Sequence, residues 1–322
     1  MILPKFDYFA PRSLVDATNW LAEHKNESAK VLAGGTDLLV NLRGKIIPDG
    51  HRPRCQQHHV GPWQARHLVV EKPHWLMALS RIPELQDITV KGNQIHIGAM
   101  VTHSQLESSD VIREKLTGLS DAASVLGSPL CRNRGTYGGN LCNARPASDT
   151  SIPTMALQGK LVLVSKRRQR IVNHTDFVIG PGESIIEPDE ILKEIIFTIP
   201  DNPMSSAYIK LANRKALEIA VVGAAAVVIF DSDKETILNA RIALAAVAPT
   251  PLLVPEAGDY LKDRKLTLET ASEAARISSQ AARPITDHRG RADYRKLMIE
   301  VLVRRALMRC RDRISRTVEK AL

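Results

Sequence analysis

Two glycine-rich segments, about a hundred residues apart, contain the residue types best suited to bind a ligand. Glycine lets the backbone adopt φ > 0 and lets a ligand approach closely, because no Cβ stands in the way. Successive backbone N–H groups in such a turn form a concave site for phosphate oxygens, and a threonine hydroxyl adds a donor. Together the segments could converge on the two phosphates of a dinucleotide. They are Val31-Leu32-Ala33-Gly34-Gly35-Thr36-Asp37 and Asn133-Arg134-Gly135-Thr136-Tyr137-Gly138-Gly139-Asn140.

The spacing of these glycines does not match the familiar nucleotide motifs. Neither segment has the G-x-G-x-x-G of the Rossmann fold or the G-x-x-x-x-G-K-[ST] of the P-loop. Either segment taken alone is equally consistent with a plain hairpin or strand-to-helix turn. Only the pair of segments favours a ligand site.

The composition describes an ordinary globular chain with room for two or three domains. It has 322 residues, of which 44% are apolar and 25% charged. Aromatic residues make up only 4%, so no stacking platform for single-stranded nucleic acid is indicated. No apolar run is long enough to cross a bilayer, and the first residues lack the apolar core of a signal peptide. We therefore expect a cytoplasmic protein without a membrane span.

The net charge of +9 needs an explanation. Much of the excess lies in Lys166-Arg167-Arg168-Gln169-Arg170 and in the last thirty residues. A nucleic-acid-binding patch is one interpretation, but no recognised nucleic-acid module accompanies the charge. We favour a solvated face, or a surface for an acidic partner subunit or an anionic cofactor, and predict no nucleic acid partner.

The cysteine and histidine pattern indicates neither disulfides nor a metal site. Cysteines stand at positions 55, 131, 142 and 310, without a C-x-x-C pair. A segment at about 48–73 interrupts the periodicity and is predicted to be an inserted loop. Its potential ligands match no structural zinc spacing, so we predict no metal there. These residues are His51, Cys55, His58 and His59.

The remaining chain alternates helices and strands in mixed order, which predicts an α+β protein. Ser13 and Thr102 begin helices, Thr102 forming a capping box with Gln105. The apolar run after the first glycine segment, 38–40, fits either a strand or a helix. Other helices are expected at about 115–126, ending at Gly127, and at 266–281 and 293–309. Strands are expected at 29–32, 87–90 paired with 94–97, 160–164, 220–230 and 237–247.

The two glycine segments and three later stretches resemble the FAD-binding subunit of molybdenum hydroxylases, the family of xanthine dehydrogenase and carbon monoxide dehydrogenase. The resemblance covers nearly the whole chain apart from residues 48–73. Its specificity comes from several separate motifs in the right order. The quoted stretches are Leu32–Leu39, Gly127–Pro129 with Arg134–Asn143, Pro146–Thr150, Ser206–Lys210 with Arg214, and Asp287–Arg295.

The resemblance implies a PCMH-type (vanillyl-alcohol-oxidase-like) FAD-binding domain of two α/β subdomains at residues 1–200, with the insertion at about 48–73. A smaller α+β domain of the CO dehydrogenase flavoprotein type would follow at 204–322. By the same match, Val31 to Leu38 and Thr136 to Asn140 would hold the FAD pyrophosphate, and Gly127 and Asp149 would contact the dinucleotide. Leu192 would meet the adenine or flavin region, although it equally fits a core leucine, and Asp149 equally fits a helix N-cap before Ile152.

Lys210 is the catalytic candidate, because the resemblance places it near the isoalloxazine, where a cation would stabilise negative charge on the reduced ring. The family implies an electron-transfer subunit with non-covalent FAD, which works with an iron–sulfur small subunit and a molybdopterin large subunit. The [2Fe–2S] clusters and the molybdopterin would lie on those partners, and NAD is one candidate acceptor. Two alternatives stay open. One is a stand-alone FAD oxidase or dehydrogenase of the same fold, and the other is a non-catalytic interaction subunit.

Overall fold

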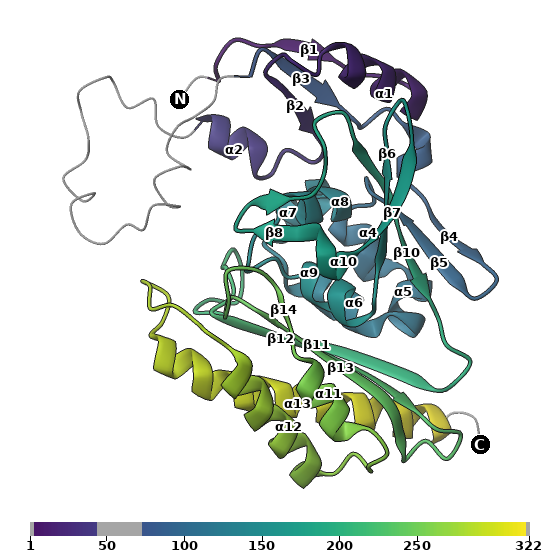
Figure 1. Ribbon diagram of the computed structural model, residues 1–322, viewed down its shortest axis with the longest axis vertical. Coiled ribbons are helices and arrows are strands. Elements are labelled where there is room, and N and C mark those ends of the chain that lie inside the picture. Colours follow the sequence, from purple (N-terminus) through teal and green to yellow (C-terminus); the bar gives the residue numbers. More distant parts are fainter. Residues whose placement is uncertain (1–2, 44–72, 320–322) are drawn as a thin grey trace.

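The computed structural model describes residues 3–43 and 73–319, and the proposed insertion with its candidate metal ligands lies almost wholly outside them. Within these ranges the chain forms three main β-sheets with helices between and beneath them (Figure 1). The predicted mixture of helices and strands, α+β, is confirmed.

The N-terminal part is a small parallel sheet of order β1-β3-β2, with a helix beside it. Ser13 begins the first helix, since its hydroxyl accepts a hydrogen bond from the Asp16 N–H at 3.1 Å. The apolar run after the first glycine segment proves to be a helix. The elements are β1 (Asp7–Phe9), α1 (Leu14–Glu23), β2 (Ala29–Leu32), α2 (Leu38–Arg43) and β3 (Trp75–Ala78).

The middle part is an antiparallel sheet of order β4-β5-β10-β6-β7, in which the late strand β10 lies between β5 and β6. The predicted hairpin and the capping box of Thr102 and Gln105 are confirmed. The strands are β4 (Ile88–Lys91), β5 (Gln94–Gly98), β6 (Lys160–Val164), β7 (Gln169–Asn173) and β10 (Ile191–Thr198), with a separate pair β8 (Val178–Gly180) and β9 (Glu183–Ser184).

Short helices fill the space between this sheet and the next (Figure 1). The helix expected at about 115–126 is confirmed as α6, and the preceding helix α5, which ends at Lys115, was not predicted. A further helix, α7, was not predicted. The helices are α4 (His103–Ser108), α5 (Asp110–Lys115), α6 (Thr117–Val125), α7 (Pro129–Arg134), α8 (Tyr137–Cys142), α9 (Ser151–Ala156) and α10 (His174–Phe177), with a 3-10 turn at Pro83–Leu85.

The C-terminal part is an antiparallel sheet, β11-β12-β13-β14, with α11 to α13 beneath it (Figure 1). The long helix predicted at 293–309 extends further, to Glu319. The elements are β11 (Met204–Leu211), β12 (Val222–Phe230), β13 (Ile237–Ala245), β14 (Leu252–Leu253), α11 (Pro255–Leu261), α12 (Leu268–Ala281) and α13 (Ala292–Glu319).

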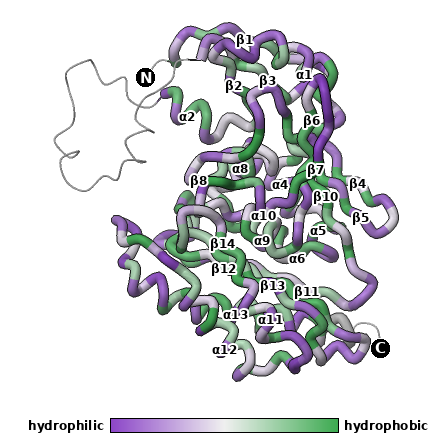
Figure 2. Tube along the Cα trace, viewed as in Figure 1, coloured by the Kyte–Doolittle hydropathy of each residue, from purple (hydrophilic) through white to green (hydrophobic). Residues whose placement is uncertain are grey.

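This last sheet is covered on both faces, which explains why β12 is apolar almost throughout. Successive side chains of a strand point to opposite faces. Accordingly Ala225 and Val227 join the core shared with the middle helices, while Ala224 and Ala226 join the core above α12 and α13. Figure 2 shows the hydrophobic residues concentrated along these interior strands. The middle helices thus pack against one face of the C-terminal sheet.

Candidate functional site

The first glycine segment forms an open turn between β2 and α2. Gly35 has φ +77°, the left-handed conformation that favours glycine. The backbone N–H groups of Gly34, Gly35, Thr36 and Asp37 donate no hydrogen bond within the described part of the chain. Residues 31–38 are all partly or fully exposed. The turn therefore carries backbone donors that are unsatisfied within the described part of the chain.

The two glycine segments are in contact with one another. A Cβ added to Gly34 would lie 2.0 Å from the carbonyl oxygen of Arg134, and one added to Gly139 would lie 3.4 Å from Cβ of Ala33. The position of a Cβ on Gly135 is 3.5 Å from Oγ1 of Thr36. Segments about a hundred residues apart thus converge at one junction.

The second segment is not the φ > 0 nest that was expected, and this expectation is corrected. Gly138 and Gly139 lie in the first turn of α8, with Thr136 as its N-cap. The N–H groups of Tyr137, Gly138 and Gly139 donate to Val101 O, Ala99 O and Thr136 Oγ1, respectively. Capping satisfies donors that a nest would leave free. These three N–H groups therefore support the junction from behind.

Gly138 is required because the chain passes very close to it. A Cβ there would lie 2.5 Å from Cβ and 2.8 Å from O of Ala99. Tyr137 is fully buried, and its hydroxyl bonds Oγ1 of Thr154 at 2.5 Å. Burial raises the pKa of that phenol despite the bond to Thr154. The Tyr137 side chain is thus part of the core, which its place in a glycine motif did not reveal.

Asn140 and Asp149 connect this junction to the C-terminal sheet. The amide oxygen of Asn140 accepts hydrogen bonds from the hydroxyls of Ser148 and Thr150, each at 2.6 Å. These two residues flank Asp149 in the sequence. The carboxylate of Asp149 accepts from the Tyr208 hydroxyl at 2.7 Å and pairs with Nζ of Lys210 at 2.8 Å. Asp149 is therefore not a helix N-cap. That position, at α9, belongs to Thr150.

Both members of the Asp149–Lys210 pair are buried, with side chains 8% and 6% exposed. Burial raises the pKa of Asp149, while Lys210 and Tyr208 act against that rise. Burial and the Asp149 carboxylate both raise the pKa of Tyr208. Nζ of Lys210 also lies 3.4 Å from the carbonyl oxygen of Val125, at the end of α6. Lys210 is thereby held between two segments of the middle part.

Gly127 and Leu192 border the same region. Gly127 has φ +54°, and its carbonyl accepts from the N–H of Leu217 in the segment after β11. The Leu192 side chain is buried in the core, at a bulge in β10. The next carbonyl, of Lys193, accepts from the N–H of Ala99, whose own carbonyl accepts from Gly138. These last two hydrogen bonds link β10 to the second glycine segment.

Sequence reasoning missed one polar side chain at the junction. His103, at the start of α4, is 2% exposed, and its backbone N–H donates to the carbonyl oxygen of Gly135 at 3.1 Å. Its Nδ1 is buried and has no hydrogen-bond partner in the described ranges. Burial, and secondarily the charge of Arg132, lowers the pKa of His103 to about 4. In the sequence, the signal for this side chain was that a histidine directly follows the capping residue Thr102.

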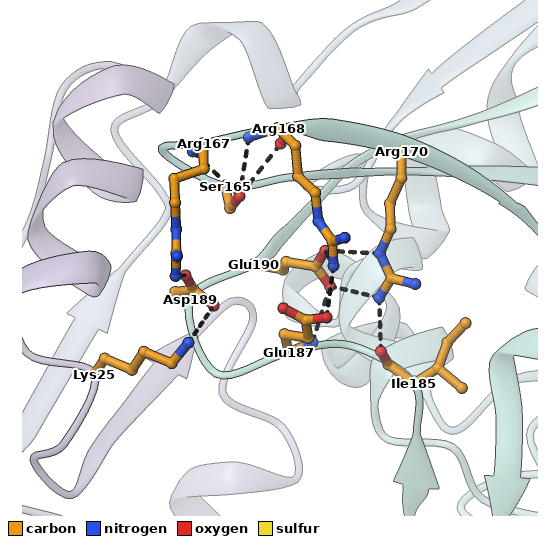
Figure 3. A network of polar contacts seen from close by, with 9 residues as sticks. All are labelled: Lys25, Ser165, Arg167, Arg168, Arg170, Ile185, Glu187, Asp189 and Glu190. Carbon is orange, nitrogen blue, oxygen red and sulfur yellow. Dashed lines mark hydrogen bonds and ion pairs between the residues drawn. The ribbon is translucent and has the colours of Figure 1, made fainter.

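The basic segment Lys166–Arg170 faces acidic side chains (Figure 3). Arg170 forms two hydrogen bonds of 2.7 Å to Glu190 and one to Ile185 O, Arg168 binds Glu187 at 2.6 Å, and Arg167 binds Asp189 at 3.3 Å. Burial alone would raise the pKa of Glu190, but the bonds from Arg170 hold it below its ordinary value. This segment is largely neutralised within the chain, which weakens the case for a docking surface.

Asp189 also pairs with Nζ of Lys25 at 3.5 Å, across from the N-terminal part (Figure 3). The network therefore fastens the small parallel sheet to the middle part. Among residues 3–43 and 73–319, no group of three or more metal-ligating side chains is found. No helix in those ranges is long and apolar enough to cross a membrane.

The family models that match this chain define a flavin-dinucleotide-binding protein. Residues 59–201 match the family model described as the FAD binding domain in molybdopterin dehydrogenase. Residues 207–310 match the CO dehydrogenase flavoprotein C-terminal domain. The expected PCMH-type FAD-binding domain followed by a CO dehydrogenase flavoprotein domain is thereby confirmed.

Relatives extend the match to nearly the whole chain. The nicotinate dehydrogenase FAD-subunit of Eubacterium barkeri is 31% identical over 312 residues, covering 96% of this chain and 97% of the relative. The xanthine dehydrogenase FAD-binding subunit of Escherichia coli O157:H7 is 31% identical, covering 93% and 94%. A carbon monoxide dehydrogenase structure from Hydrogenophaga pseudoflava superposes with a TM-score of 0.83 at 31% identity, covering 96% and 98%. The chain belongs to the family of FAD-binding subunits of molybdenum hydroxylases, and is therefore an oxidoreductase subunit.

Proposed function

We propose that this chain holds one FAD non-covalently and passes electrons between iron–sulfur clusters of a partner subunit and an external acceptor such as NAD. The organic substrate would react at molybdopterin on a large subunit. The observation that carries the proposal is the junction of the two glycine segments, with its open N–H groups at residues 34–37. We further propose a cytoplasmic location and a domain division between residues 200 and 204.

The residues at the junction fit the FAD diphosphate. The N–H groups of Gly34 to Asp37 and the hydroxyl of Thr36 would donate to its oxygens, and the absence of Cβ atoms at Gly34 and Gly139 allows the two segments to touch. The bound flavin would supply one- and two-electron chemistry. The chain would position it, with the remaining proposed contacts at Gly127, Asn140, Asp149, Leu192 and Lys210.

Lys210 is proposed to stabilise negative charge on the reduced flavin. Its pairing with Asp149 and its contact with Val125 O fix the ammonium group in one place. A cation held by buried partners loses little freedom when a ligand arrives, and the Asp149 carboxylate offsets part of its charge. Asp149 is on this account a positioning residue for Lys210 as well as a proposed contact of the dinucleotide.

The test is purification of the full chain, alone and with its natural partners. Released by acid, the flavin should prove to be FAD rather than FMN, because residues 59–201 match an FAD-binding domain. The chain alone should reduce dyes slowly with NADH, but it should not oxidise purines, aldehydes, CO or aromatic acids. Flavin that stays attached after denaturation, or substrate turnover by this chain alone, would favour the stand-alone flavoenzyme. A folded chain without flavin affinity would favour an interaction subunit.

A further inference from the structure

The His103 imidazole lies directly behind the junction of the two glycine segments. A Cβ placed on Gly135 would be 3.1 Å from Cδ2 of His103 and 3.5 Å from Oγ1 of Thr36. Both side chains therefore lie near the same point beside Gly135. Cδ2 is bonded to Nε2 within the ring, so the edge nearest the junction carries a ring nitrogen.

The imidazole has no hydrogen-bond partner at either ring nitrogen among the described residues. Nδ1 is buried without a partner, and no hydrogen bond to Nε2 is formed in the same ranges. Buried polar groups are usually paired, because an unpaired one costs about 1–3 kcal/mol. The buried unpaired atom is Nδ1, and Nε2, bonded to Cδ2, is the ring nitrogen nearer the junction.

Burial first, and the charge of Arg132 second, disfavours the protonated form of His103 before any ligand binds. Arg132, on α7, is the charged group that acts on the ring, and its own Nε binds Glu107 of α4 at 2.8 Å. The polar group facing it across Gly135 is the neutral Thr36 hydroxyl. No carboxylate shifts the titration of His103, so an arriving anion would supply the missing countercharge.

We propose that His103 takes up a proton when the FAD diphosphate binds beside Gly135 and Thr36, so that this side chain makes the affinity for FAD depend on pH. The inference rests on the proposed function, and specifically on the diphosphate lying at the junction. It assigns to His103 a positioning and regulatory role, in which the imidazolium ion faces the bound anion. Its own chemistry is limited to a reversible protonation.

The expected effect follows from proton linkage. If binding returns His103 from a pKa of about 4 to an ordinary value of about 6.5, Kd for FAD falls roughly tenfold between about pH 7.5 and about pH 5.5. FAD binding to the full apo chain is measured by flavin fluorescence at both pH values. Titration calorimetry in buffers of different ionisation enthalpy counts the protons taken up.

The variant His103→Gln should bind FAD with the same Kd at both pH values and without proton uptake. His103→Leu, which keeps a similar volume, serves as a second uncharged variant in case one of them folds poorly, as judged by circular dichroism. The matched control is His96→Gln. This histidine lies on β5 and pairs with Glu194 at 3.0 Å, and the variant should keep the tenfold change.

Equal Kd values for the wild-type chain at the two pH values would overturn the inference while leaving the proposed function intact. A pH dependence that persists in both His103 variants would overturn it as well. A wild-type chain that binds no FAD at either pH would instead refute the proposed function.

Discussion

Substituting Gly34 by alanine should abolish FAD binding without unfolding the protein. The new Cβ would lie 2.0 Å from the carbonyl oxygen of Arg134, whereas real Cβ atoms essentially never come closer than 3.0 Å to another atom. Because this oxygen belongs to the backbone, it cannot move aside as a flexible side chain would, and the two segments must separate by about 1 Å or more. A displacement of that size carries a hydrogen bond of about 2.9 Å beyond its useful range.

The expected magnitude follows from the bonds that are lost. Hydrogen bonds to a charged group contribute about 1.5–3 kcal/mol each, so losing two to the diphosphate costs about 3–6 kcal/mol, or roughly 10²–10⁴ in Kd. The assay is fluorescence titration of the apo chain with FAD, together with the flavin-to-protein ratio after purification. Far-UV circular dichroism and thermal unfolding establish that the variant is folded.

Two other glycines provide matched controls. Gly92→Ala, in the β4–β5 hairpin, meets nothing within 4 Å and has φ +60°, so it should lower stability by about 1–2 kcal/mol and leave Kd unchanged. Gly35→Ala, at φ +77°, meets the flexible side chains of Leu39, at 2.9 Å, and Leu32, at 3.2 Å, and should weaken binding less than Gly34→Ala does. A Gly34→Ala chain whose Kd stays within about threefold of wild type would refute the reasoning that the junction holds the diphosphate.

Two further predictions concern buried ionisable groups. Lys210→Met should lower the free energy of unfolding by about 3–5 kcal/mol, because among the described residues it leaves the buried Asp149 carboxylate with only Tyr208 as a partner. Adding Asp149→Asn should recover most of this loss, as measured by urea denaturation. A double variant as unstable as the single one would contradict this. Burial lowers the pKa of His174 to about 4. As the pH falls below about 6.5, the unfolded chain therefore binds a proton at this histidine while the native chain does not. The free energy of unfolding accordingly falls as the pH drops from about 6.5 to about 4. His174 should therefore contribute a loss of roughly 2 kcal/mol between about pH 8 and about pH 5, which His174→Gln removes. An unchanged slope in that variant, measured by urea denaturation at both pH values, would count against it.

Local structure could be predicted well where short-range interactions decide it. The capping box of Thr102 with Gln105, the hairpin around Gly92 and the apolar strands that became β12 and β13 all depend on residues close in sequence. Their hydrogen bonds and side-chain periodicities are fixed within a few residues, so the sequence alone contains the information. The order of several separate motifs likewise sufficed to indicate the family, which the relatives confirmed.

The sequence by itself thus determined many of the elements, the two glycine segments and the kind of ligand they suit. Only the tertiary structure decided what those glycines do. Gly35 adopts the left-handed conformation that the sequence suggested, but Gly138 lies in a helix and is glycine because Ala99 passes 2.5 Å from where its Cβ would be. The pairing of Asp149 with Lys210 joins residues 61 positions apart, and the unpartnered His103 lies behind a segment more than thirty residues further along the chain. Such contacts depend on how sheets and helices pack around shared cores, and no local pattern of residues specifies them.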